Sequence, residues 1–176
     1  VQEKQILFES FHGKDLSDSP FYILTEFLKM ENADQYQIYF ATNNYAEHKK
    51  TAEAMGLPVK LVDIDTFEYA KVLATSKYLI NNSSFPAYFI RREEQIYLQT
   101  WHGTPLKRLA FDQEEVTAAS PTYKAQFYRQ KQEWDYLIAA NHFSSEIFKS
   151  CFMYTNGNML EIGYPRNDLM YAKNKD

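Results

Sequence analysis

The sequence contains little cysteine and glycine, and it has no long apolar run. Cys151 is the only cysteine among 176 residues, so no internal disulfide can form, which fits a reducing compartment. The five glycines are scattered, and the glycine-rich motifs of P-loops and dinucleotide sites are absent, which argues against those two functions. No run approaches the roughly 18 apolar residues that span a bilayer, and the start has no signal-peptide core. We therefore expect a soluble intracellular protein. A start at Val1 rather than Met predicts a piece of a longer chain.

An excess of basic residues is also absent. The chain has 19 Lys and Arg against 23 Asp and Glu, which gives a formal net charge of −4. A nucleic-acid binder needs a basic excess to neutralise phosphates, so we expect no nucleic-acid partner. The histidines lack the spacing of a zinc site, and no carboxylate cluster suits Mg²⁺. We expect neither a metal nor a cofactor.

Apolar residues, by contrast, are plentiful. They make up 45% of the chain, with 14 Tyr and 13 Phe, so a packed core is easily supplied. Short apolar segments alternate with helical patterns of about ten residues. Strands are predicted at residues 5–10, 36–42, 59–62, 78–80, 95–99, 136–139 and 160–162, and helices at 20–28, 45–55, 67–75, 121–132 and 144–152. Residues 111–120 are predicted to be a mobile loop.

This alternation predicts βαβ units in an α/β fold. Right-handed crossovers place helices on both faces of a mostly parallel sheet, so we predict a single doubly wound, Rossmann-like domain over residues 1–176. Ligands of such sheets bind outside the carboxyl ends of the strands. The segments that follow predicted strands are 12–14, 42–44, 81–84, 101–104 and 141–142. We expect these segments to form one site.

The most informative segment is W-H-G-T-P-L-K-R at residues 101–108. A neutral imidazole held on a strand-to-helix turn can accept a proton from a hydroxyl group, which makes His102 a candidate general base. Gly103 would let a substrate approach the backbone closely. The alternative is a structural turn with a solvent-facing histidine.

The second half of that segment has the features of a helix start. Thr104 can cap a helix, and Pro105 suits its first position. Free N–H groups there, with Lys107 and Arg108 nearby, would favour a phosphate. The alternative is two surface cations.

Weaker candidates follow the first and last strands. Gly13 and Lys14 could contact a phosphate, although an ordinary turn is the simpler interpretation. Arg166 could bind a phosphate or a carboxylate, whereas Asn167 or Asp168 could simply cap a terminal helix.

Three further features are weaker candidates for a role in the chemistry. His48 lies in a polar helix and is predicted to be solvated, and Cys151 lies on an apolar helix face and is predicted to be a core residue. The aromatic residues at 85–90, followed by Arg91 and Arg92, are core or an interfacial patch that meets anionic headgroups.

Four segments carry a resemblance to a known family. They are F-E-S-F-H-G-K at 8–14 with S-D-S-P at 17–20, Q-T-W-H-G-T-P-L-K at 99–107, W-D-Y-L-I at 134–138 with Asn141 and Ser144, and G-Y-P-R-N-D at 163–168. The chain resembles the CDP-glycerol glycerophosphotransferases, the teichoic-acid primases and polymerases of Gram-positive bacteria. The resemblance implies a GT-B architecture of two Rossmann-like domains, of which this chain matches the acceptor-side first domain.

The resemblance also assigns roles to residues. His102 matches a family histidine that is implicated in catalysis. Lys14 and Lys107 are implied to contact an acceptor phosphate, and Thr104 and Asn141 to position the substrate. The remaining implied substrate-binding residues are Gly13, Asp18, Gly103 and Arg166.

The implied reaction transfers glycerol phosphate, or a related polyol phosphate, from its CDP derivative to a lipid-linked or polyol-phosphate acceptor and releases CMP. The donor CDP-glycerol would bind mainly to the missing second domain, so the fragment alone is expected to be inactive. The implied location is the cytoplasmic face of the cell membrane, with peripheral attachment. Two alternatives stay open: a non-catalytic module that binds polyol phosphate or a membrane surface, and half of a nucleotide-sugar GT-B glycosyltransferase.

Overall fold

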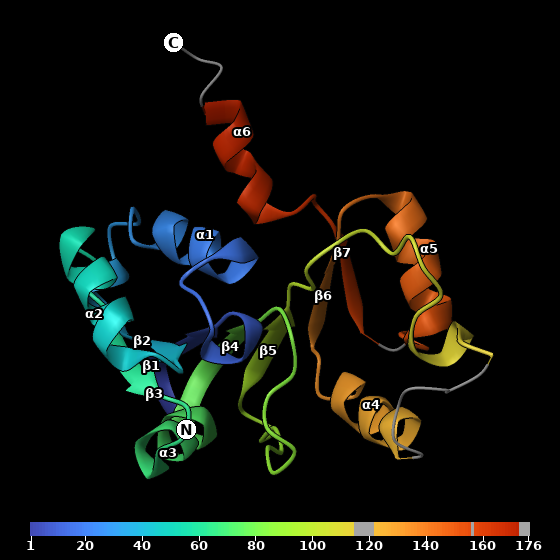
Figure 1. Ribbon diagram of the computed structural model, residues 1–176, viewed down its shortest axis with the longest axis horizontal. Helices are drawn as coiled ribbons and strands as arrows, with labels where there is room; N and C mark the ends of the chain where they lie inside the picture. Colours follow the sequence, from blue (N-terminus) through green and yellow to red (C-terminus); the bar gives the residue numbers. More distant parts are fainter. Residues whose placement is uncertain (115–121, 156, 173–176) are drawn as a thin grey trace.

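Seven strands among the described residues form one parallel sheet (Figure 1). The computed structural model describes residues 1–114, 122–155 and 157–172. Each pair of neighbouring strands is parallel, and the strand order is β3-β2-β1-β4-β5-β6-β7. The strands are β1 (Gln2–Glu9), β2 (Gln37–Thr42), β3 (Lys60–Asp63), β4 (Ser76–Asn81), β5 (Ile96–Gln99), β6 (Tyr136–Ala139) and β7 (Asn158–Glu161).

The helices connect these strands in the predicted alternation. The α-helices are α1 (Asp18–Phe27), α2 (Tyr45–Ala54), α3 (Phe67–Thr75), α4 (Tyr123–Lys131), α5 (His142–Cys151) and α6 (Asp168–Ala172). Short 3₁₀ turns are η1 (Phe11–Gly13), η2 (Ala33–Gln35), η3 (Ala110–Asp112) and η4 (Pro165–Asn167). Within the part of the chain that the structure describes, none of the helices has the length and hydrophobicity required to cross a membrane.

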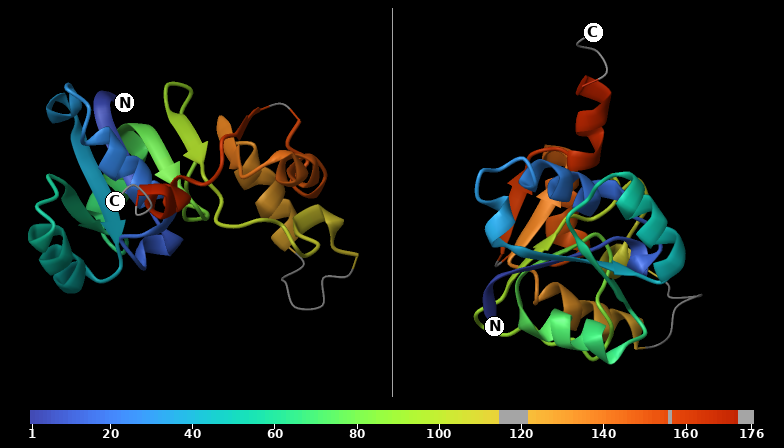
Figure 2. Two further views of the ribbon diagram at one scale, coloured as in Figure 1. Left: turned by 90° about the horizontal axis from the view of Figure 1, so that it is seen from above. Right: turned by 90° about the vertical axis from the view of Figure 1, so that its left-hand side faces the viewer.

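The strand order confirms a doubly wound α/β sheet. From the central neighbours β1 and β4, the chain runs outward in both directions, which is the Rossmann arrangement with its switch point between these two strands. Right-handed crossovers place α1 and α2 on one face and α3 and α4 on the other. The right-hand view of Figure 2 shows α1 and α2 above the sheet and α3 below it.

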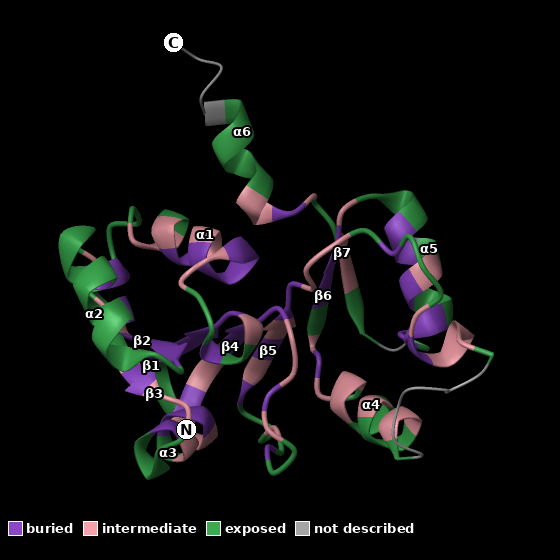
Figure 3. Cartoon of the chain, in the orientation of Figure 1, coloured by how far each residue is buried: buried purple, intermediate pink, exposed green. Residues whose placement is uncertain are grey.

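Two apolar clusters correspond to the two faces. The larger one includes Tyr69 and Leu73 of α3 with Phe148 and Cys151 of α5, all at most 1% exposed. Burial raises the pKa of the Cys151 thiol to about 12, and the prediction of a core cysteine is confirmed. The smaller cluster packs α1 against β1, β2 and β4. Figure 3 shows the buried strand interior and the exposed outer surfaces of α2 and α6.

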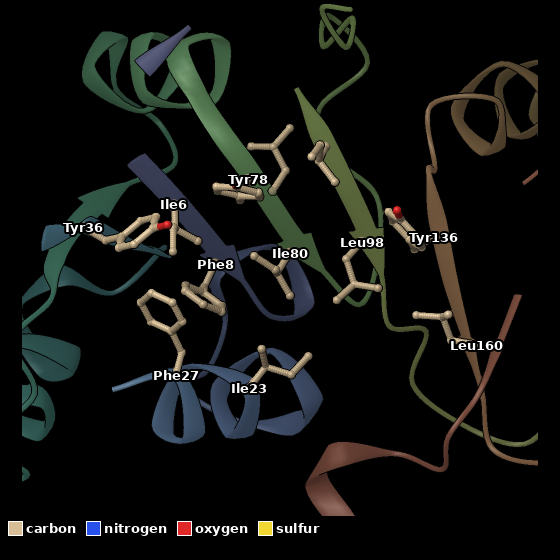
Figure 4. A pocket seen from close by; sticks show the side chains of 12 residues that line it. Ile6, Phe8, Ile23, Phe27, Tyr36, Tyr78, Ile80, Leu98, Tyr136 and Leu160 are labelled. Atoms are coloured by element: carbon tan, nitrogen blue, oxygen red, sulfur yellow. The ribbon is translucent and has the colours of Figure 1, made fainter. Parts of the chain in front are cut away.

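One face of the sheet is only partly covered. Helices α1 and α2 cover β1 to β3, while the helices that connect β5, β6 and β7 lie in the larger cluster on the opposite face. An apolar groove of about 410 Å³ therefore lies beside α1 (Figure 4). Its walls include Phe8, Ile23, Phe27, Ile80, Leu98, Tyr136 and Leu160.

The structure corrects several expected boundaries. No helix follows Pro105, because residues 101–109, all of them described, run as an irregular loop up to η3. The last strand is Asn158–Glu161 rather than 160–162. In the predicted loop 111–120, Phe111 packs against Phe127, and residues 115–120 lie outside the described residues, as does Pro121 of the predicted helix 121–132.

The aromatic segment at 85–90 is partly core and partly exposed. Phe85 and Phe89 are at most 6% exposed and pack on Tyr97, so they are core. Tyr88 and Ile90 are 61% and 72% exposed.

Candidate active site

The carboxyl ends of β1, β4 and β5 lie side by side. Glu9 is paired with Asn81, and Asn81 with Gln99, so the segments that follow these residues start at the same edge. Thr100 N–H donates to the Asn81 carbonyl at 2.9 Å, which extends the pairing one residue further. The topology therefore brings the loop that carries His102 against the loops that follow β1 and β4.

The imidazole of His102 has a fixed hydrogen bond on one nitrogen. Nδ1 lies 2.7 Å from the main-chain oxygen of Asn82. A carbonyl oxygen can only accept, so Nδ1 carries the proton in the neutral ring, and Nε2 keeps its lone pair. His102 is half-buried, and its ring is not sealed in the core. This arrangement leaves Nε2 as the proton acceptor.

Two aromatic rings contact the imidazole. The Trp101 ring stacks on it at 4.3 Å between centroids and 25° between planes, and the Phe11 ring lies at 5.9 Å. Trp101 is itself anchored in the core, with Phe152 at 4.6 Å and Phe148 at 6.1 Å. Core packing thus restricts the ring of His102 from the Trp101 side.

The main chain of the same loop is held by the last motif of the sequence. Arg166 Nη1 donates to the His102 carbonyl oxygen at 2.8 Å, and the Tyr164 hydroxyl donates to the Gly103 carbonyl oxygen at 2.7 Å. Burial raises the pKa of Tyr164 to about 12, so its hydroxyl stays protonated and donates at neutral pH. The segment after β7 therefore clamps the histidine loop.

Asp18 connects these parts. Its Oδ1 lies 2.7 Å from Arg166 Nη1, and its Oδ2 accepts from Asn82 Nδ2 at 2.6 Å. The side chain of Asp18 is only 5% exposed. Of the sequence-predicted residues, His102, Gly103, Asp18 and Arg166 are thus brought together in one hydrogen-bonded group.

Backbone strain is concentrated around His102. The described residues include six non-glycine positions with positive φ, and four of them are Phe11 (47°), His12 (57°), Asp18 (60°) and Trp101 (53°). Such conformations cost about 1–3 kcal/mol each and persist only where the surroundings enforce them. Their concentration at one edge of the sheet is typical of a functional site.

Gly13 is buried in a position where only a glycine fits. Its φ is +76°, and a Cβ there would lie 2.9 Å from the main chain of Thr42 and Asn43. Asn43 N–H donates to the Gly13 carbonyl at 2.8 Å. A glycine is needed here because the loop after β1 passes directly over the end of β2.

The other predicted contacts lie on the surface. Lys14, Thr104 and Lys107 are exposed, and the two lysine side chains have no ion pair or hydrogen bond to any described residue. Asn141 is the N-cap of α5, where its side chain accepts from Ser144 N–H at 2.9 Å. No helix begins at Thr104, so the predicted helix start is wrong and Lys107 projects from a loop, whereas the phosphate contact of this segment stays a prediction.

The prediction for His48 is also wrong. It is 7% exposed, and its Nδ1 lies 2.5 Å from the Thr42 hydroxyl. The face of helix α2 that carries His48 packs against the end of β2, and the polar pattern of the helix alone does not reveal this. Among the described residues, no group of three or more His, Cys, Asp or Glu side chains is arranged to hold a metal ion.

Sequence reasoning missed three residues at this edge. Asn82 and Tyr164 lie in segments that were singled out, but each contact uses a main-chain oxygen, that of Asn82 itself for His102 and that of Gly103 for Tyr164, which no residue pattern shows. Glu9 is 1% exposed and bonded to the Tyr69 hydroxyl at 2.5 Å, and burial raises the pKa of its carboxyl to about 7. A charged residue at the end of an apolar strand was the available signal for Glu9.

Comparison with known proteins gives a consistent set of relatives. Teichoic acid poly(glycerol phosphate) polymerases of Staphylococcus epidermidis and Bacillus subtilis are 39% and 37% identical to the whole chain, which covers 24% and 23% of their lengths. Teichoic acid glycerol-phosphate transferase of Staphylococcus aureus is 34% identical over 97% of the chain, which covers 43% of that protein. The chain thus spans between about a quarter and somewhat under half of these relatives.

Solved structures agree with these relatives. A histidine-to-alanine variant of the Wall Teichoic Acid Polymerase TagF matches the whole chain with a TM-score of 0.85 at 37% identity, and the match covers 42% of that chain. A histidine-to-asparagine variant of TagF soaked with CDPG also has a TM-score of 0.85, at 36% identity over 43% of its chain. The family described as CDP-Glycerol:Poly(glycerophosphate) glycerophosphotransferase matches residues 1–176. The chain therefore belongs to the CDP-glycerol:poly(glycerophosphate) glycerophosphotransferase family.

Proposed function

We propose that this chain is the acceptor-side half of an enzyme that transfers glycerol phosphate, or a related polyol phosphate, from CDP-glycerol to a growing or lipid-linked acceptor. The observation that carries the proposal is the hydrogen bond between Nδ1 of His102 and the Asn82 carbonyl, which leaves the lone pair on Nε2 at the carboxyl edge of the parallel sheet. Family membership and the teichoic acid relatives support the same reaction.

In the proposed mechanism His102 acts as the general base. The acceptor hydroxyl oxygen attacks the phosphorus of the glycerol phosphate group while its proton passes to Nε2 of His102. A new P–O bond forms to the acceptor, and the P–O bond to CMP breaks. The Asn82 carbonyl stabilises the resulting imidazolium through Nδ1–H.

Cations near the acceptor complete the proposal. Lys107 and Lys14 are exposed and unpaired among the described residues, so their ammonium groups are available for acceptor phosphates. Lys107 lies five residues beyond His102 in the same loop. We therefore propose that the acceptor phosphate nearest the reacting hydroxyl binds on the Lys107 side.

The donor site belongs to a second Rossmann-like half in this proposal, as in a GT-B architecture. The chain covers 42% of the matching TagF chain, which leaves room for such a half. The fragment alone is then expected to release no CMP from CDP-glycerol.

Peripheral attachment to the cytoplasmic face of the membrane is part of the same proposal. The exposed Tyr88 and Ile90 stand beside the exposed Arg92, a combination that suits the boundary between headgroups and acyl chains. This surface also supports the second candidate function, a module that binds membranes without turnover.

The experiment compares full-length enzymes that contain this chain. CMP release from CDP-glycerol is measured with a primed acceptor for the wild type and for His102→Ala. His142→Ala is the matched control, because His142 is exposed on α5 and pairs with Glu161. We expect a loss of at least about 10²-fold for His102→Ala and a rate near the wild type for the control. Wild-type turnover in His102→Ala would reject the proposed role.

A further inference from the structure

Two charged side chains, Asp18 and Arg166, lie one step behind His102. Both carboxylate oxygens of Asp18 are occupied, one by Arg166 and the other by Asn82. Asp18 is 5% exposed and Arg166 is 34% exposed as side chains. Asp18 thus reaches the histidine loop through its two partners, and Arg166 contacts the main chain of His102 directly.

The first connection runs from Asp18 through Asn82 to the imidazole ring. An ionised carboxylate only accepts, so the amide of Asn82 must turn Nδ2 toward Asp18. Its Oδ1 then accepts from Phe11 N–H at 2.9 Å. With both ends of this fully buried amide fixed, the main-chain carbonyl of Asn82 is held in place for Nδ1 of His102.

The second connection runs from Asp18 through Arg166 to the main chain of the histidine. Nη1 of Arg166 donates to Asp18 Oδ1 at 2.7 Å and to the His102 carbonyl at 2.8 Å. The same carboxylate therefore reaches both the ring and the backbone of His102. The positive φ of Asp18 shows that the chain accepts local strain to put the carboxylate there.

We propose that Asp18 and Arg166 are positioning residues, which hold His102 as its Nδ1–H tautomer with Nε2 directed to the acceptor. The catalytic consequence rests on the proposed function, whereas the tautomer does not. The Nε2–H form is the commoner tautomer of free histidine in water, so the protein must impose the other one.

The test uses ¹⁵N NMR of the histidine side chains in the 176-residue chain at about pH 9, above the ordinary titration range of histidine. The His102 signals are assigned by their loss in His102→Gln. We expect the wild type to show a protonated Nδ1 and an unprotonated Nε2. Predominance of the Nε2–H form in the wild type would overturn the proposal.

Variants separate positioning from general folding. Asp18→Asn removes the charge at nearly constant volume, and we expect a mixture of both His102 tautomers. Asp15→Asn, three residues away and exposed, is the matched control and should leave the spectrum unchanged. If Asp18→Asn fails to fold, Arg166→Met removes the second connection at a less buried position, and Arg166→Lys should restore part of the wild-type signal. His48, bonded to Thr42, serves as an internal reference in every spectrum.

Kinetics of the full-length enzyme then separate this inference from the proposed function. We expect Asp18→Asn and Arg166→Met to lower kcat by about 10- to 100-fold, with a smaller change in the KM for CDP-glycerol. An unchanged tautomer and an unchanged kcat in both variants would overturn the positioning roles, even if His102→Ala is inactive. If His102→Ala is active but the Asp18 and Arg166 variants change the tautomer of His102, the role of His102 as a base would be rejected and the positioning roles of Asp18 and Arg166 would be retained.

Discussion

The main-chain oxygen of Asn82 and the Nδ1 of His102 are 2.7 Å apart, and this contact decides which nitrogen of the ring can act as a base. The two residues follow neighbouring strands, β4 and β5, so the sheet itself sets their separation. Because the acceptor is a main-chain atom, a substitution of the Asn82 side chain keeps this oxygen and removes only the side-chain hydrogen bonds that hold it in place. The fixed tautomer is thus a property of the topology as much as of any one residue.

Gly13→Ala should destabilise the chain strongly. The methyl group would meet the main chain of Thr42 and Asn43 at 2.9 Å, and φ is +76°. We expect the free energy of unfolding in urea to fall by about 3 kcal/mol or more. Gly56→Ala is the matched control, because φ is +63° but nothing lies within 4 Å, and about 1 kcal/mol is expected. Equal losses for both variants would contradict the close approach of the loop to β2.

Glu9 should make stability depend on pH. Burial raises the pKa of its carboxyl from 4.5 to about 7, so between these values the folded state binds more protons than the unfolded state. The free energy of unfolding should therefore decrease as the pH rises through this window, by on the order of 3 kcal/mol. Urea unfolding at about pH 5 and pH 8 measures the decrease.

Glu9→Gln is the variant that isolates this effect. A neutral amide keeps a partner for the Tyr69 hydroxyl and removes the titration. We expect the decrease between the two pH values to shrink and the stability at the higher pH to increase. The exposed Glu94→Gln is the control and should behave as the wild type. A full decrease that persists in Glu9→Gln would assign the pH dependence to another group.

Lys107→Ala should weaken the acceptor more than the donor. Its exposed ammonium lies in the histidine loop, so its loss removes a charge-assisted contact to an acceptor phosphate. We expect the KM for the acceptor to rise about tenfold, with little change in the KM for CDP-glycerol. Lys49→Ala on α2 provides a control lysine outside the loop. The reverse pattern would place Lys107 on the donor side.

Ile90→Ser should weaken attachment to vesicles that contain anionic lipid. Ile90 is 72% exposed, so the change removes apolar surface without opening the core, unlike a change at Phe89, which is 6% exposed. We expect a several-fold loss of co-sedimentation. Ile162→Ser, at a second exposed isoleucine, is the control. Unchanged binding of Ile90→Ser would count against this surface.

The sequence predicted the alternation of elements well, because the strands are short apolar runs and Gly56 ends α2 as expected. It failed where tertiary packing decides the outcome. Thr104 and Pro105 have the chemistry of a helix start, but the clamp from Tyr164 and Arg166 holds the preceding residues and the chain continues as a loop. His48 was expected in water and is buried against Thr42.

For the site, sequence predicted which segments meet but not how their atoms pair. His102, Asp18 and Arg166 were singled out, and the structure joins them. The connecting residue, Asn82, acts through its carbonyl oxygen and buried amide, and neither interaction has a sequence signature.

Chemical rescue tests the central claim, that Nε2 of His102 takes the proton from the acceptor hydroxyl. His102→Gly leaves a space beside the rings of Phe11 and Trp101 that a free imidazole can enter. In the full-length enzyme, CMP release by this variant should be very slow and should rise with the concentration of neutral imidazole. Release that is fast without imidazole, or that stays slow at saturating imidazole, would contradict the account.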